Sequence, residues 1–170
     1  MMSLLICFVM TAGCSVNPSS SALHAIHDTS VLTAARFASV TARSGVWTPS
    51  RFQRAAGEGI YFLDHYDESK IPVLFIHGLY GSPRNFQYLI EHLDRSHFQP
   101  WVYYYASGAS LASIAGRLLH EIDTLCAYYG ARSIVIVAHS MGGLIARDLL
   151  LRASLAHHAA VPVLITLSTP

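Results

Sequence analysis

Ser140 stands at the junction of two contrasting stretches of sequence. Residues 134–137 before it are all β-branched, as in a buried strand, and the residues after it carry apolar side chains at helical spacing. A strand that turns directly into a helix must bend sharply, so the positions two before and two after the bend should be small, as Ala138 and Gly142 are. Such a bend would project the Ser140 hydroxyl beside the first N–H groups of the helix, where the helix dipole favours negative charge. This arrangement is suited to a nucleophilic serine. The alternative is that Ser140 is an ordinary helix N-cap, whose hydroxyl accepts hydrogen bonds from the first backbone N–H groups of the helix.

A second run that could do chemistry is the glycine-bearing loop at residues 77–82, His-Gly-Leu-Tyr-Gly-Ser. Acyl transfer places negative charge on a carbonyl oxygen, and fixed backbone N–H donors stabilise that charge. Because the loop follows the apolar run at residues 73–76, it could present such a donor toward the turn at Ser140. Taken alone, the loop fits an anion site at a helix N-terminus equally well.

Together the two runs resemble the motifs of the α/β-hydrolase superfamily, over residues 71–170, and look most like those of lipase-like and PGAP1-like esterases. The resemblance implies a serine hydrolase that acts on an ester or lipid-like small molecule through an acyl-enzyme on Ser140, with no cofactor and no metal. It assigns the oxyanion hole to the backbone N–H groups of Leu79 and Met141. The residues that would shape the two motifs are His77, Gly78, Ala138, His139, Gly142 and Gly143.

The same resemblance requires an acid and then a histidine after the nucleophile. Beyond Ser140 the sequence offers Asp148, His157 and His158. Asp148 falls inside the helix after the nucleophile, and the two histidines enter the last strand at the opposite edge of the sheet. We therefore predict that these residues form a fragment without a general base and with little activity. A non-catalytic remnant or binding protein and an acyltransferase on the same fold are the alternatives.

Alternating strands and helices must position these motifs. Apolar runs predict buried strands at residues 73–76, 102–105, 134–137 and 161–167. Spacings of three and four predict helices over 82–93 and 110–129 and a third helix after Ser140. This alternation predicts the α/β class, a partial α/β-hydrolase fold with a mostly parallel sheet, helices on both faces and no C-terminal strands. The aromatic run at 101–105 fits either the border of an acyl pocket or a buried strand.

The first thirteen residues form a short apolar run that ends in small residues before Cys14. Such a run is too short to span a bilayer and is typical of a secretory signal. Residues 10–14, Met-Thr-Ala-Gly-Cys, resemble a bacterial lipobox. The resemblance implies lipidation of Cys14 and a membrane anchor in the cell envelope, on the outer membrane of a Gram-negative host. The alternatives are an ordinary signal with a secreted or periplasmic product, and a wrongly assigned start codon.

The remaining sequence divides into a tether and helical segment at 14–58 and a truncated hydrolase domain at 59–170, with a break in the helices at Gly45–Pro49.

Composition excludes several classes of function. The formal net charge is +1 and no Lys/Arg-rich block occurs, so nucleic acid is not an expected partner. The ten histidines are scattered rather than placed at metal-ligand spacing. Charged residues make up 12% of the chain and hydrophobic residues 52%, and this composition excludes a disordered chain. The cysteine at position 126, Cys126, is expected to pack in the core.

Overall fold

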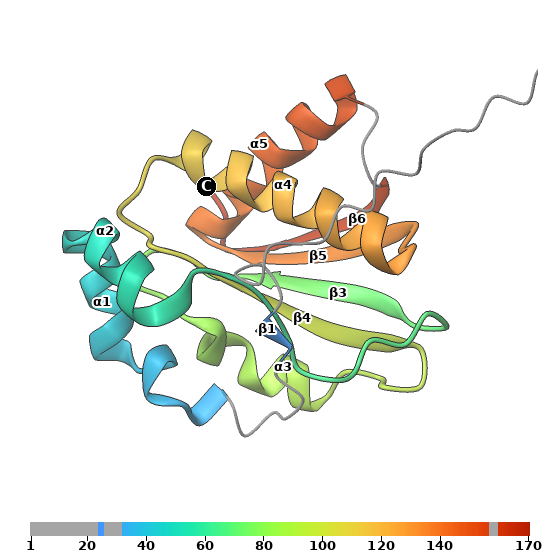
Figure 1. Ribbon diagram of the computed structural model, residues 1–170, viewed down its shortest axis with the longest axis horizontal. Coiled ribbons are helices and arrows are strands. Elements are labelled where there is room, and N and C mark those ends of the chain that lie inside the picture. The colour runs from blue at the N-terminus through green and yellow to red at the C-terminus, as the bar shows by residue number, and fades with distance from the viewer. Residues whose placement is uncertain (1–23, 26–31, 157–159) are drawn as a thin grey trace, which may run out of the picture.

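The computed structural model describes residues 24–25, 32–156 and 160–170 (Figure 1). The predicted signal peptide and Cys14 lie outside the described residues, as do His157 and His158. None of the described helices has the length and hydrophobicity that a bilayer-spanning segment needs.

Six strands form one sheet in the order β1-β2-β4-β3-β5-β6. β2 runs antiparallel to β4, and every other neighbouring pair is parallel. Because β3 lies between β4 and β5, the carboxyl ends of these three parallel strands meet at one edge of the sheet. The predicted α/β class with a mostly parallel sheet is confirmed. In chain order the strands are His24–Ala25, Gly59–Phe62, Ile71–Ile76, Phe98–Tyr104, Ser133–His139 and Ala160–Leu167.

Helices cover both faces of the sheet (Figure 1). α4 (Leu111–Tyr129) and α5 (Met141–Ala156) cover one face. The short α3 (Gln87–Glu91) covers the other face, together with the helical segment that precedes β2. The central strand β3 shows why both layers are needed. Its side chains alternate between two cores, with Leu74 and Ile76 under α4 and α5 and with Val73 and Phe75 on the opposite side.

The two helices predicted from apolar spacing differ in outcome. α4 begins and ends as expected, because the Ser110 hydroxyl caps its first turn and Gly130 leaves it in the left-handed conformation at φ 70°. The helix predicted over 82–93 is wrong in length. A capping box between Ser82 and Asn85 tightens its first turn into a 3-10 helix, Pro83–Phe86, so that the regular α-helix spans only Gln87–Glu91.

The segment before β2 belongs to the same core as the sheet. It contains a 3-10 turn (Ala35–Phe37), α1 (Ser39–Trp47), α2 (Pro49–Phe52) and a π-helical turn (Gln53–Gly57). The rings of Phe37 and Phe52 meet the edge of Tyr104 with centroids 5.0 and 4.8 Å apart. The break predicted over Gly45–Pro49 is confirmed, because α1 ends at Trp47, Thr48 is not helical and α2 begins at Pro49. At Gly45, inside α1, an added Cβ would lie 3.0 Å from the Phe52 ring, so the helix packs tightly on this ring.

In the described chain β6 forms one edge of the sheet. The side chains of Val163, Ile165 and Leu167 are 45%, 47% and 37% exposed. On the side of α3, Ile165 and Leu167 line an apolar groove of about 420 Å³. An apolar strand at a sheet edge is prone to pair with another chain.

Cys126, on α4, packs against the core as expected, and burial raises the pKa of its thiol to about 11.

Candidate active site

Ser140 occupies a one-residue turn between β5, which ends at His139, and α5, which begins at Met141. Its backbone is left-handed at φ 51°, a conformation that costs energy for a residue with a side chain. Two backbone hydrogen bonds hold it there. The Ser140 N–H donates to the Leu167 carbonyl at the end of β6, and the Gly143 N–H donates to the Ser140 carbonyl, both at 2.9 Å. The predicted bend between sheet and helix is therefore present at this residue.

Two glycines allow α5 to start this close to the sheet. A Cβ on Gly142 would lie 2.3 Å from the carbonyl oxygen of Ile76, at the end of β3. A Cβ on Gly143 would lie 2.1 Å from Oγ1 of Thr169. The sequence predicts small residues at both Ala138 and Gly142. For Gly142 the structure gives a reason, because this residue opposes the backbone of the neighbouring strand, whereas Ala138 is buried beneath the turn.

The loop at residues 77–82 lies directly against this turn. A Cβ on Gly78 would be 3.0 Å from the Ser140 Cβ and 3.1 Å from Nδ1 of His139, so the two segments are in tight contact at this glycine. Met141 is the first residue of α5 and has no intrahelical acceptor for its N–H. The Leu79 N–H likewise makes no loop hydrogen bond with the described protein groups. Both predicted oxyanion donors are thus on segments that meet beside Ser140.

His77 is fully buried at the base of this loop. Its ring stacks on Tyr105 with centroids 4.2 Å apart, and its Nδ1 lies 2.9 Å from the Gly78 carbonyl, to which it donates. Burial lowers the pKa of His77 to about 4, so the ring is neutral near pH 7. The arrangement fits the predicted loop-shaping role, because the imidazole is occupied in supporting its own loop.

Tyr105 was missed in the sequence as a support of the site. Its hydroxyl donates to the His77 carbonyl, which fixes the first residue of the loop. The aromatic run at 101–105 is buried throughout, between 0 and 1% exposed, as the buried-strand alternative predicts. Tyr105 directly follows β4 as the third of three consecutive tyrosines, so no local pattern distinguished it as the one whose hydroxyl reaches the loop.

Among the residues that the structure describes, no acid or base forms a hydrogen bond with the Ser140 hydroxyl. Asp148 lies farther along α5, where both of its carboxylate oxygens accept from Arg152 at 3.1 Å. His139 is exposed at the end of β5, with its ring against Gly78. In the same part of the chain, no three His, Cys, Asp or Glu side chains gather as a metal site.

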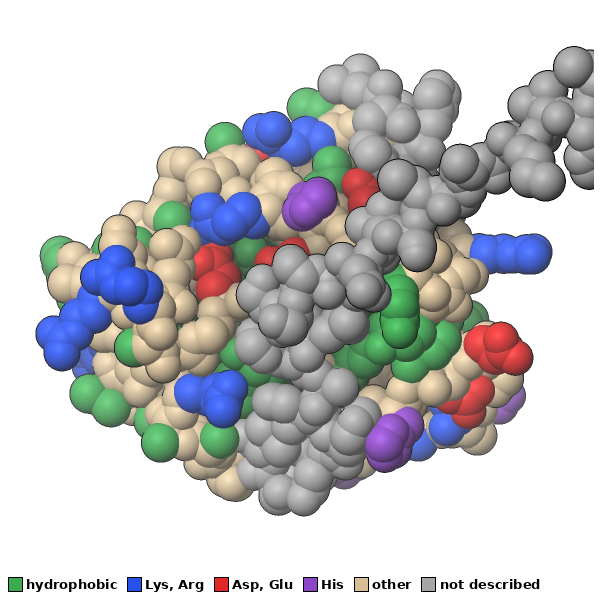
Figure 2. Space-filling model, viewed as in Figure 1, with side chains coloured by type: hydrophobic (Ala, Val, Ile, Leu, Met, Phe, Trp, Pro, Cys, Tyr) green, Lys and Arg blue, Asp and Glu red, His purple; other side chains and the backbone are tan. Residues whose placement is uncertain are grey.

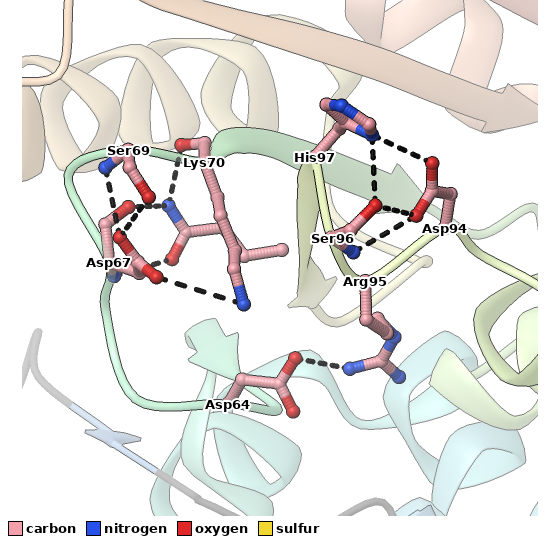
Figure 3. Close-up of polar contacts among 9 residues, drawn as sticks. Asp64, Asp67, Ser69, Lys70, Asp94, Arg95, Ser96 and His97 are labelled. Carbon is pink, nitrogen blue, oxygen red and sulfur yellow. Dashed lines mark hydrogen bonds and ion pairs between the residues drawn. The ribbon is translucent and has the colours of Figure 1, made fainter.

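A carboxylate–imidazole pair does occur, but at the other edge of the sheet (Figure 3). Asp94 Oδ2 lies 2.8 Å from Nδ1 of His97, and the Ser96 hydroxyl also donates to this carboxylate. These contacts hold the pKa of Asp94 at about 2, with the hydrogen bond from Ser96 as the largest cause. Because His97 directly precedes β4 and Ser140 follows β5, the length of the parallel strands separates the pair from the turn at Ser140. The pair therefore belongs to a surface turn.

Comparison with known proteins gives one family match. A family model described as alpha/beta hydrolase fold matches residues 71–169, more than half of the chain. No curated protein sequence matches. The narrower resemblance to PGAP1-like esterases stays a prediction.

Several solved structures are similar to the chain. The mature form of Bacillus licheniformis lipase BlEst2 is 23% identical with a TM-score of 0.49, over 63% of this chain and 44% of the lipase. A structure from Nitrososphaera gargenis, described with carboxylesterases, is 23% identical with a TM-score of 0.49, over 65% of this chain and 42% of that one. MGS-MChE2, an alpha/beta hydrolase enzyme from a sediment metagenome of the Mar Chica lagoon, is 20% identical with a TM-score of 0.44, over 59% of this chain and 45% of that enzyme. The chain spans less than half the length of each of these proteins.

Proposed function

The chain belongs to the α/β-hydrolase fold family, and on that premise we propose that it is the nucleophile-bearing part of a serine ester hydrolase of the lipase or carboxylesterase type. In the proposed reaction the Ser140 hydroxyl oxygen attacks the carbonyl carbon of an ester or lipid-like substrate. Its proton passes to a base, the alcohol leaves with a proton, and the acyl group stays on Ser140. Attack by water on this acyl-enzyme then releases the carboxylic acid and restores the hydroxyl.

The observation that carries this proposal is the left-handed backbone of Ser140, at φ 51°, in a turn that touches the Gly78 loop. A strained conformation at a serine persists only where its surroundings impose it, and such strain is common at reactive residues. The N–H groups of Leu79 and Met141 are the proposed donors to the developing oxyanion. Loss of one such donor typically lowers turnover by about 10²–10³.

The proposal also covers what the described residues lack. Because no base among them is hydrogen-bonded to the Ser140 hydroxyl, we expect residues 1–170 alone to turn over esters slowly. The acid and the base would come from further sequence of a complete enzyme. Lipidation of Cys14 and attachment to the cell envelope remain part of the proposal.

Fluorophosphonate labelling tests the nucleophile directly. After long incubation at mildly alkaline pH, we expect intact-mass measurement to show one adduct, and peptide mapping to locate it on Ser140. Ser140→Ala should abolish the adduct. Ser168→Ala is the matched control, since Ser168 is an exposed serine that is also left-handed, at φ 49°. Wild-type protein that is labelled no faster than Ser140→Ala would remove the case for a nucleophile in this chain.

A further inference from the structure

The helical segment at residues 32–57 has an unbalanced charge. It contains four arginines and no aspartate, glutamate or lysine, in a chain whose formal net charge is only +1. All four, Arg36, Arg43, Arg51 and Arg54, are exposed. Within the described residues none of them forms an ion pair with a carboxylate. The nearest acid in sequence, Glu58, pairs instead with Arg117 at 2.8 Å.

The arginines share their surface with large exposed apolar side chains. On α1, Val40, Arg43 and Trp47 follow one another at spacings of three and four, so they lie on one face of the helix. Val40 is 74% exposed and Trp47 is 75% exposed. In the next turns Arg51 and Arg54 point outward while Phe52 packs inward. Figure 2 shows blue basic and green hydrophobic side chains gathered at the end of the molecule where Figure 1 draws α1 and α2.

This surface adjoins the candidate active site. The Gly108 N–H, in the loop after β4, donates to the Gly45 carbonyl of α1 at 3.1 Å, and the Tyr80 N–H donates to the hydroxyl of the neighbouring Ser107 at 3.2 Å. The guanidinium of Arg43 lies 5.9 Å from the centroid of the Tyr80 ring. Leu79 and Tyr80 are themselves 48% and 43% exposed, so the exposed face of α1 continues onto the loop beside Ser140.

We propose that this basic apolar face, formed by Val40, Arg43, Trp47, Arg51 and Arg54 with Leu79 and Tyr80, binds the surface of a bilayer containing anionic phospholipid. Arginines suit lipid phosphates because their guanidinium groups donate paired hydrogen bonds, and each cation gains energy near an anionic surface. An exposed tryptophan among cations is typical of segments that lie in the membrane interface. The charge and the apolar groups together favour lipid over a purely polar anion. Binding would turn the carboxyl edge of the sheet, with Ser140, toward the lipid.

Vesicle binding tests the inference. The full chain with Cys14→Ser, which removes any lipid anchor, would be mixed with vesicles of phosphatidylcholine alone or of equal parts phosphatidylcholine and phosphatidylglycerol. We expect cosedimentation with the anionic vesicles only, weakened by high salt, and a blue shift of tryptophan emission. That shift reports Trp47, because the second tryptophan, Trp101, is 1% exposed. Ser140→Ala should bind equally, so this result does not depend on the proposed chemistry.

Matched substitutions locate the binding surface. Arg54→Gln should weaken partitioning roughly 5-fold, the usual contribution of one cation near an anionic surface. Arg132→Gln makes the same change in charge on an exposed arginine before β5, at the opposite sheet edge, and should have no effect. Trp47→Ala should weaken binding, whereas Tyr128→Ala, which removes an aromatic ring 56% exposed on α4, should not. Equal losses for Arg54→Gln and Arg132→Gln, binding to neutral vesicles alone, or sedimentation without a shift in Trp47 emission would each overturn the proposal.

Discussion

Adding one methyl group at Gly142 should separate the turn at Ser140 from the sheet. A Cβ there would lie 2.3 Å from the Ile76 carbonyl oxygen and 2.6 Å from the His77 carbonyl oxygen. Both are backbone atoms that cannot rotate away, so β3 or the start of α5 must move. Forcing extra volume into a packed site costs about 1–3 kcal/mol. We expect Gly142→Ala to lower the free energy of unfolding by about this amount.

Gly116→Ala is the matched comparison for this substitution. Gly116 lies in the middle of α4, where a Cβ would meet nothing within 4 Å. The same methyl group there should stabilise the protein by about 1 kcal/mol through helix propensity alone. Urea unfolding followed by circular dichroism should therefore separate the two variants by about 2–4 kcal/mol, with opposite signs relative to the parent. Equal unfolding midpoints would refute the claim that Gly142 is required by the approach of the strand.

Three further predictions concern backbone strain, protonation and the sheet edge. Ser140→Gly should raise the free energy of unfolding by about 1 kcal/mol in urea titrations, because glycine adopts positive φ without strain, whereas Ser140→Ala should give no such gain. Burial raises the pKa of Glu121 from 4.5 to about 7, so between these pH values the folded state retains a proton that the unfolded state loses. The contribution of this group to the free energy of unfolding is therefore fully present below pH 4.5 and is lost as the pH rises toward 7. Glu121→Gln keeps an acceptor for the Ile60 N–H. Its free energy of unfolding should equal that of the parent in acid and exceed it by about 2–3 kcal/mol above pH 7. A difference between the two proteins that does not change with pH would contradict this. Ile165→Lys should reduce self-association in sedimentation velocity experiments, because a charge at an exposed edge opposes strand pairing.

The helices, strands and turns that depend on residues close together in the sequence could be predicted from it. The apolar stripe of α4, its capping residues Ser110 and Gly130, and the β-branched run of β5 each act through neighbouring residues, and the structure has them where expected. The turn at Ser140 could be predicted for the same reason, since a strand and a helix that directly adjoin must bend between them.

Features that depend on contacts distant in sequence could not be predicted. The partner of Gly142 is Ile76, which lies far earlier in the chain and becomes its neighbour only when β3 pairs with β5. Tyr105 supports the His77 loop through one hydrogen bond that no local pattern reveals. The packing of Phe37 and Phe52 on Tyr104 likewise depends on β4 being in place. The shortened helix at α3 shows the opposite case, in which a local capping box outweighed an apolar spacing.

Because the Ser140 amide donates to the Leu167 carbonyl, the backbone conformation of the proposed nucleophile depends on β6 as well as on β5. Within the described residues β6 pairs only with β5, so opening of its last residues would also release the amide of residue 140. Hydrogen exchange at that single amide should then follow fraying of the strand end instead of unfolding of the whole molecule. A ligand, membrane or partner that covers β6 would slow this exchange and hold the serine in its left-handed conformation, without touching the serine itself.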